Sequence, residues 1–230
     1  AEGDDIETAR RRIWAIDRDG LILESMPDLP PHQRPFARPT DEVAGWTRGG
    51  QAGAPGLFDT ITNVQPDVLI GASGQRGSFD ETCVREMARH CPAPVIFSLS
   101  NPSSRAEANP ADLLAWTGGK GLIGSGCPFP VQGVAQVNNV YIFPGVGLGA
   151  LAAGATCVTD TMFLAAARRL GMLEGGGGSL LPPVADLRQV AVEIAVAVAE
   201  QARHDGVAGS PPEACTPEAI AARMWTAAYS

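Results

Sequence analysis

Short apolar runs alternate with helical stretches along the first part of this chain. The apolar runs have the character of strands and lie at residues 13–17, 68–70, 95–99, 121–123 and 140–143. Helices are expected over residues 5–12, 80–90 and 111–116, whereas the proline- and glycine-rich residues 24–56 predict loop with one short helix. Such alternation is typical of βαβ units, so the sequence predicts an α/β fold in which helices flank a parallel sheet.

Helices are expected to dominate the rest of the chain. Residues 146–170 are rich in alanine and glycine, 184–203 form a helix that is apolar on most faces, and 218–229 form a short terminal helix. The four glycines at 175–178 predict a flexible break. Gly147 begins a G-x-G-x-x-A pattern, but no strand with an acidic residue follows its helix, so close helix packing is favoured over nucleotide binding.

Composition narrows the classes of function. The 230 residues are 45% hydrophobic and 18% charged, which is typical of a globular protein. The net charge of −8 argues against nucleic acid and an anionic membrane surface as partners. Residues 121–159 lack charged side chains and histidine, but prolines and amides interrupt them, so we interpret them as a buried centre and not as a membrane span. Five cysteines without a Cys-x-x-Cys motif, and no visible signal peptide, predict a cytoplasmic protein.

Polar groups lie at or near the ends of several predicted strands. In an open α/β sheet, ligands bind outside the carboxyl ends of the strands, so we expect these groups to form one ligand site. The groups are Asp17, Ser73, Gly74, Asn101, Asn138 and Asn139.

Each of these groups also has an ordinary structural alternative. The Asp17 carboxylate is placed to accept hydrogen bonds from a ribose, or to cap a turn before Gly20. The glycines of residues 71–77 let backbone N–H groups approach a ligand, or form a tight turn. The asparagine amides suit a carboxamide ring or a carboxylate substrate, or serve as turn residues. The three histidines are isolated, and no metal-ligand spacing occurs.

Five sequence blocks, in this order, resemble the carboxyl-terminal, dinucleotide-binding domain of malic enzymes. The resemblance covers nearly the whole chain, and its most specific parts are Leu-Ser-Asn-Pro at 99–102 and Asn-Asn-Val-Tyr-Ile-Phe-Pro-Gly at 138–145. The blocks are residues 13–21, 68–75, 98–107, 124–129 and 138–149.

The resemblance implies a Rossmann-like fold and roles for matching residues. Asp17 would lie by the adenosine ribose, and Ser73 and Gly74 would line the cofactor cleft. Asn101 and Asn139 would contact the nicotinamide end and malate, with Asn138 beside them at the cofactor. The segment at residues 26–30 looks more like bacterial NAD-preferring members, but Arg18 and Arg34 leave NADP open, because an arginine near a ribose pairs with a 2′-phosphate.

The same resemblance implies that important groups of the complete enzyme lie elsewhere. The family's catalytic tyrosine and lysine, its ligands for Mg²⁺ or Mn²⁺ and its glycine fingerprint precede the matched segments, so we expect no catalytic residue and no metal ligand here. Neither Lys120 nor Tyr141 matches a catalytic position. We expect a carboxyl-terminal piece of a malic enzyme that lacks the first βα unit, with a Rossmann-like domain at residues 1–171 and a helical extension at 172–230.

Function and partners follow as expectations. The complete enzyme would oxidatively decarboxylate malate to pyruvate and CO₂ with NAD or NADP, and this piece would be inactive alone. An uncovered sheet edge and face would favour a homo-oligomer or a missing N-terminal domain as partner. The alternatives are a non-catalytic nucleotide-binding module and another two-domain dehydrogenase, although residues 138–145 argue against the latter.

Overall fold

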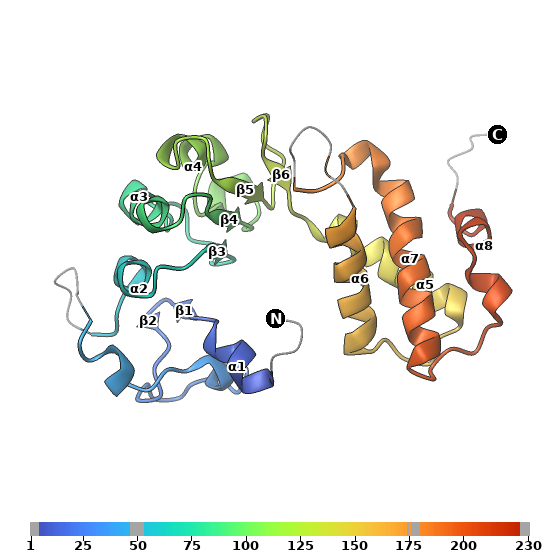
Figure 1. Cartoon of the computed structure of the whole chain (residues 1–230), viewed down its shortest axis with the longest axis horizontal. Coiled ribbons are helices and arrows are strands. Elements are labelled where there is room, and N and C mark those ends of the chain that lie inside the picture. The colour runs from blue at the N-terminus through green and yellow to red at the C-terminus, as the bar shows by residue number, and fades with distance from the viewer. Residues whose placement is uncertain (1–4, 47–52, 174, 176–179, 226–230) are drawn as a thin grey trace. The chain divides into compact units, whose positions relative to one another are not determined.

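The chain folds into two compact units, residues 1–123 and 124–230. The computed structural model describes residues 5–46, 53–173, 175 and 180–225. The principal sheet has the strand order β3-β4-β5-β6 (Figure 1), and its β3–β4 and β5–β6 pairs are both parallel. The predicted α/β class with a parallel sheet is confirmed.

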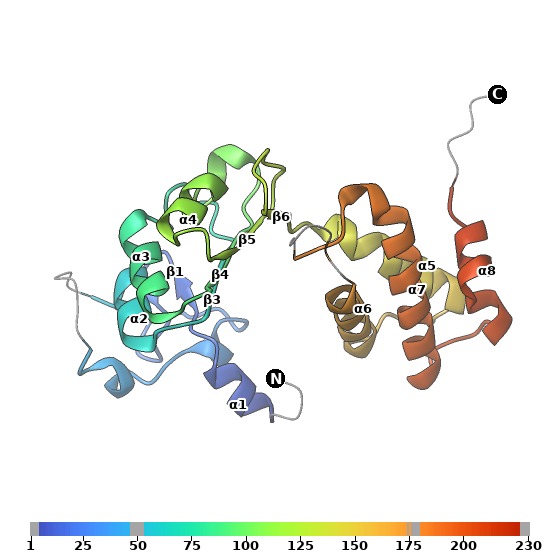
Figure 2. The same cartoon turned by 45° about the horizontal axis from the view of Figure 1, so that its top comes forward.

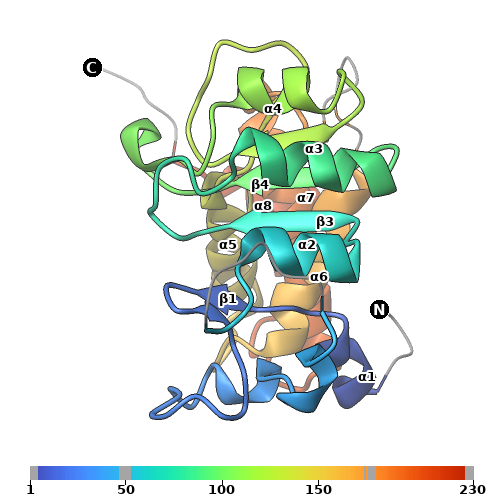
Figure 3. The same cartoon turned by 90° about the vertical axis from the view of Figure 1, so that its left-hand side faces the viewer.

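In the first unit, three helices cover one face of strands β3 (Val68–Gly71) and β4 (Val95–Ser98) and of the start of β5 (Leu122–Ser125). Figures 1 and 2 show these helices on the same side of the strands, and Figure 3 looks onto that side. They are α2 (Leu57–Val64), α3 (Glu81–His90) and α4 (Pro110–Trp116). Three strands and two helices match their predicted positions, whereas α2 was not predicted.

Alternation along β3 explains which side the helices cover. Leu69 is buried, as are Ile96 and Ile123 on the neighbouring strands, and they belong to the core with Met87 of α3. Val68 and Ile70 point to the opposite face, because successive side chains of a strand alternate, and they are 50% and 60% exposed.

The predicted strand at 13–17 is wrong in length and in partner. Helix α1 (Ile6–Arg11) precedes a two-residue strand, β1 (Ile16–Asp17), which pairs antiparallel with β2 (Gly20–Leu21) in a sheet of its own. Gly20 takes a φ of 105°, and the Leu21 N–H donates to the Pro55 carbonyl, so the chain turns back at once and does not extend. The loop that follows contains the 3₁₀ turns η1 (Arg34–Phe36) and η2 (Asp41–Val43).

The second unit is mainly helical. Helix α7 (Leu187–His204) packs against α5 (Phe143–Ala153) and α6 (Asp160–Met172), and Ile194, Val198 and Ala202 are fully buried in its core. Strand β6 (Ala135–Gln136) and the turn η4 (Asn139–Tyr141) precede these helices. Within the described part of this unit, η6 (Val184–Asp186), η7 (Pro212–Cys215) and α8 (Pro217–Ala222) follow.

Two further predictions change in this unit. The predicted strand at 140–143 is wrong, because Asn138 caps a 3₁₀ turn and Pro144, in the first turn of a helix, starts α5 at Phe143. The predicted helix at 218–229 runs only over Pro217–Ala222, and its residues from 226 on lie outside the described part, as do glycines 176–178. Within the described ranges, no helix is both long enough and apolar enough to cross a bilayer.

Candidate functional site

The loops that follow β3 and β4 leave the same edge of the sheet. The strands are parallel, with Gly71 opposite Ser98. Just beyond this pair, the Leu99 N–H donates to the Gly71 carbonyl at 2.9 Å. The segments Ser73–Gly74 and Ser100–Asn101 therefore begin side by side, as parallel strand ends require.

A buried carboxylate joins these two loops. Glu107 lies between η3 (Ser103–Arg105) and α4, and its side chain is fully buried. Its Oε1 accepts hydrogen bonds from the Ser73 N–H at 2.8 Å, from the Ser73 hydroxyl at 2.9 Å and from the Ser100 hydroxyl. Its Oε2 accepts from the Ser98 hydroxyl at 3.1 Å and from the Ser100 N–H at 3.3 Å. Five donors thus surround one carboxylate.

This environment keeps Glu107 ionised. Burial raises the pKa of a carboxyl group, but the hydrogen bonds from Ser100, the backbone and Ser73 favour the charged form more strongly, so the pKa falls to about 2. The Glu107 charge is therefore present at neutral pH within the protein interior.

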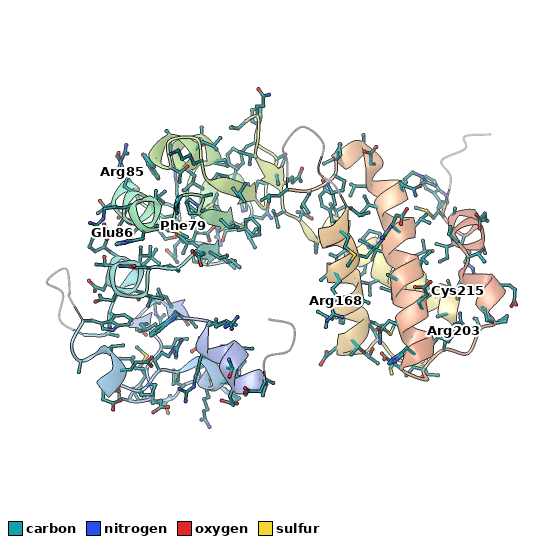
Figure 4. All side chains as sticks on the ribbon, viewed as in Figure 1. Phe79, Arg85, Glu86, Arg168, Arg203 and Cys215 are labelled. Carbon is teal, nitrogen blue, oxygen red and sulfur yellow. The ribbon has the colours of Figure 1, made fainter. Side chains whose placement is uncertain are left out.

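Gly71 makes room for this carboxylate. A Cβ atom at Gly71 would lie 2.6 Å from the Glu107 Cγ and 2.6 Å from the Phe79 Cζ. Figure 4 shows Phe79 on the strand side of α3, whereas Arg85 of that helix points away from the sheet. The glycine at the end of β3 is therefore required by close packing and not only by the turn that follows.

The backbone amides of the loop after β3 are directed toward this network. The Gly74 N–H donates to the Ser100 Oγ at 2.8 Å, and the Gln75 N–H donates to the Ser73 Oγ at 3.1 Å. The Ser73 N–H already donates to Glu107. Ser73 itself is exposed, Gly74 is half-buried with a φ of 66°, and Asn101 is exposed directly after the buried Ser100.

Asp17 lies on the β1–β2 hairpin and not on the principal sheet. Its carboxylate is exposed, with Oδ1 accepting from the Arg18 N–H and Oδ2 accepting from the Gln33 Nε2, each at 2.7 Å. The Arg18 backbone bond, followed by the Gln33 bond, holds the pKa of Asp17 below its usual value. The Arg18 guanidinium is exposed, and its Nε lies 3.7 Å from the Asp19 Oδ1. The hairpin thus presents an ionised carboxylate beside an exposed cation.

The asparagine pair belongs to the second unit. Asn138 donates from Nδ2 to the Gly126 carbonyl at 3.2 Å and accepts the Val140 N–H at 3.0 Å through Oδ1, so it caps η4. Asn139 is exposed at the start of η4. The pair follows strand β6, and does not precede a strand as predicted.

A cavity of about 340 Å³ lies next to this segment. Most of its lining residues are apolar, but polar atoms form about half of its surface, and the Tyr141 hydroxyl donates to the Pro182 carbonyl at 2.6 Å at its wall. Burial raises the pKa of the Cys127 thiol, which is therefore neutral. The lining residues are 127–129, 134–136, 141 and 181–184.

The G-x-G-x-x-A pattern is part of a helix contact. A Cβ at Gly149 would lie 2.5 Å from the Ala195 carbonyl oxygen, and one at Gly145 would lie 2.6 Å from the Ile194 Cγ2. At Gly147, by contrast, nothing lies within 4 Å of the built Cβ. The favoured interpretation, close helix packing, is confirmed, although Gly145 and Gly149 make the contact. Over the described ranges, no three His, Cys, Asp or Glu side chains cluster as metal ligands do.

Sequence reasoning did not single out Glu107 as a site residue. It lies in the block at 98–107, but a single acidic residue seven positions beyond a serine carries no pattern. Its neighbours Ala106 and Ala108 are both buried, which only the structure shows. An acidic residue within a buried run needs partners, and serines at the two strand ends supply them.

Comparison with known proteins agrees with the fold described above. Residues 1–203 match the family model described as "Malic enzyme, NAD binding domain". The chain is 43% identical over 239 residues to an NAD-dependent malic enzyme of Pseudomonas savastanoi, covering 99% of this chain and 42% of that protein. It is 45% identical over 240 residues to one of Edwardsiella ictaluri, covering all of this chain and 42% of the relative. The chain thus spans less than half the length of these relatives.

A solved structure gives the same result for the fold alone. The malic enzyme of Entamoeba histolytica superposes with a TM-score of 0.66 over 90% of this chain and 40% of that chain, at 24% identity. The resemblance carried by the five sequence blocks is confirmed.

Proposed function

The chain belongs to the malic enzyme family, within its NAD-binding domain, and we propose on that basis that it binds NAD at the rim formed by the loops after β3 and β4. The observation that carries the proposal is the junction of the two loops through Glu107, which sets Ser73–Gly74 beside Ser100–Asn101. Ligands of open α/β sheets bind at such an edge.

Asp17 is proposed to hold the adenosine ribose. Its carboxylate is ionised and exposed, and each oxygen accepts one described hydrogen bond, which leaves further acceptor capacity for a hydroxyl group. A carboxylate at this place repels a 2′-phosphate and so favours NAD over NADP. The exposed Arg18 is the residue that a 2′-phosphate would engage.

The asparagines are proposed to act at the nicotinamide end. Asn101 and Asn138 would contact the carboxamide ring, and Asn101 and Asn139 would contact malate. A neutral amide both donates and accepts hydrogen bonds, so it suits a carboxamide and a carboxylate alike. The Asn138 side chain uses one donor and one acceptor within the protein, which fixes its orientation and leaves its second N–H for a ligand.

The overall reaction is proposed for the complete enzyme: oxidation of malate at C2 with loss of CO₂ to give pyruvate. A divalent Mg²⁺ or Mn²⁺ would polarise the substrate carbonyl there. This chain would supply the binding surface for the cofactor, with malate oxidation requiring the rest of the protein.

Calorimetric titration of the purified chain with NAD, NADP and ATP tests the proposal. We expect saturable binding of NAD, weaker binding of NADP and no detectable binding of ATP. Equal affinities for NAD and ATP would favour the general nucleotide-binding module, and no heat at about 1 mM NAD would contradict the proposal. A parallel assay of NADH formation from malate with Mn²⁺ is expected to show no turnover. Robust turnover would contradict the proposal that malate oxidation requires the rest of the protein.

A further inference from the structure

Glu107 has no role in the proposed contacts, yet it is the most densely bonded carboxylate of the described site. A fully buried charge is costly unless hydrogen bonds compensate it. Here the donors come from Ser73 in the loop after β3, from Ser98 at the end of β4 and from Ser100 in the loop that follows, so both loops contribute. A charge that only stabilised the fold would not need to be placed between the two loops of the candidate site.

The carboxylate also fixes the direction of the whole network. A serine hydroxyl has one proton, and an ionised carboxylate only accepts. Ser73 and Ser100 therefore donate their protons to Glu107 and present their oxygens to backbone donors. Those donors are the N–H groups of Gln75 and Gly74. One charge thus determines which way three consecutive amides, those of residues 73–75, point.

This orientation limits what the loop offers to a ligand. A phosphate needs free backbone N–H groups, as at a glycine-rich phosphate loop. The three amides of residues 73–75 are used within the protein, so this loop suits the ribose or nicotinamide part of a dinucleotide better than the pyrophosphate.

We propose that Glu107 is a positioning residue for dinucleotide binding, which holds the loops 73–75 and 100–101 in one arrangement by orienting the hydroxyls of Ser73 and Ser100. It touches no cofactor itself and acts through the two serines. The inference rests on the proposed function, since the ligand it names is the dinucleotide.

The experiment compares Glu107→Gln with Asp59→Asn in the full chain. Asp59 is also a buried carboxylate of the first unit, but it lies in α2, where its Oδ2 accepts the Gly56 N–H at the start of that helix. We expect Glu107→Gln to raise the NAD dissociation constant of the folded protein about tenfold, and Asp59→Asn to leave it unchanged. Amide hydrogen exchange is expected to speed up at residues 73–75 in the first variant only.

A second pair keeps the test valid if Glu107→Gln does not fold. Ser98 and Ser100 each donate to Glu107, but of the two only the Ser100 hydroxyl also accepts a hydrogen bond from the Gly74 N–H. Ser100→Ala is expected to weaken NAD binding more than Ser98→Ala, at similar losses of stability. If Glu107→Gln bound NAD as tightly as Asp59→Asn, and Ser100→Ala as tightly as Ser98→Ala, the positioning role would be overturned and the proposed function would remain intact. Absence of NAD binding by the unmodified chain would instead overturn the proposed function, and this inference with it.

Discussion

Glu107 Oε1 accepts both the backbone N–H and the hydroxyl of Ser73, at 2.8 and 2.9 Å. A residue next to α4 thereby holds the loop after β3, 34 positions earlier in the chain. This contact links the packing of the first unit to the candidate cofactor site, because any change that moves the carboxylate also moves the loop.

Substitution of Gly71 tests that link. A methyl group at Gly71 would overlap Glu107 and Phe79, so Gly71→Ala is expected to lower the free energy of unfolding by about 1–3 kcal/mol. Urea unfolding followed by circular dichroism measures the change. Gly45→Ala is the control, because nothing lies within 4 Å of its built Cβ, and it should change stability by less than about 1 kcal/mol.

The ionisation of Glu107 makes stability depend on pH. Its pKa is about 2 in the folded protein and 4.5 in an ordinary environment, so the unfolded chain binds its proton first as pH falls. The stabilisation is therefore complete above about pH 4.5 and is lost as pH falls toward 2. Glu107→Gln should reduce the dependence of the free energy of unfolding on pH in this range. An unchanged slope between pH 2 and pH 4.5 would contradict the assignment.

A second carboxylate titrates in the same window and must be separated from the first. Hydrogen bonds from Thr159, Thr161 and Gln201 lower the pKa of Asp205 to about 2. Asp205 lies in the second unit, so Asp205→Asn should remove its part of the slope independently of Glu107→Gln. Additive slopes in the double variant are the expected result.

The second unit depends on the close approach of α5 and α7. A methyl group at Gly149 would lie 2.5 Å from the Ala195 carbonyl oxygen, so Gly149→Ala is expected to destabilise the protein by about 1–3 kcal/mol. Gly147→Ala on the same helix has open space and should be neutral or stabilising by up to about 1 kcal/mol. Thermal unfolding of the two variants measures the difference, and equal midpoints would contradict the packing assignment.

Strands β3, β4 and β5 of the principal sheet were predictable because they coincide with apolar runs, whereas the two-residue β6 was not predicted. Residues 68–70 and 95–99 have this form, and glycine, serine and asparagine mark where each ends. The same rule misled at 13–17 and 140–143, where Gly20 and Pro144 decide the conformation. Apolar composition alone does not decide whether such a run is extended; here the positive φ of Gly20 and the proline in the first turn of α5 decide it.

The candidate site was predictable only in part, for a different reason. Ser73 and Asn101 are found by their place after strands, since parallel strands align their ends. Glu107 makes its contacts with residues up to 34 positions away, and no local period of the sequence encodes that separation. Its role follows from tertiary packing, which becomes visible once Gly71 is seen to leave space for it.

Asp17 is the residue through which cofactor preference can be tested. Asp17→Asn keeps the shape of the side chain but removes the charge that repels a 2′-phosphate, while Arg18 remains exposed beside it. We expect NAD affinity to fall about tenfold, because a hydrogen bond from ribose to a charged acceptor is worth more than one to an amide. NADP affinity should stay level or rise, so the NADP dissociation constant divided by the NAD dissociation constant should fall.

Asp41→Asn is the matched control, because Asp41 is also exposed in the first unit but lies on η2 and not on the β1–β2 hairpin itself. Titration of both variants with NAD and NADP, at low and at high salt, measures the ratio. Salt screens the repulsion of an exposed charge over about 10 Å at 0.1 M, so the NADP affinity of the unmodified chain should approach that of Asp17→Asn as salt increases. A preference for NAD that persists in Asp17→Asn would show that selection lies elsewhere in the site.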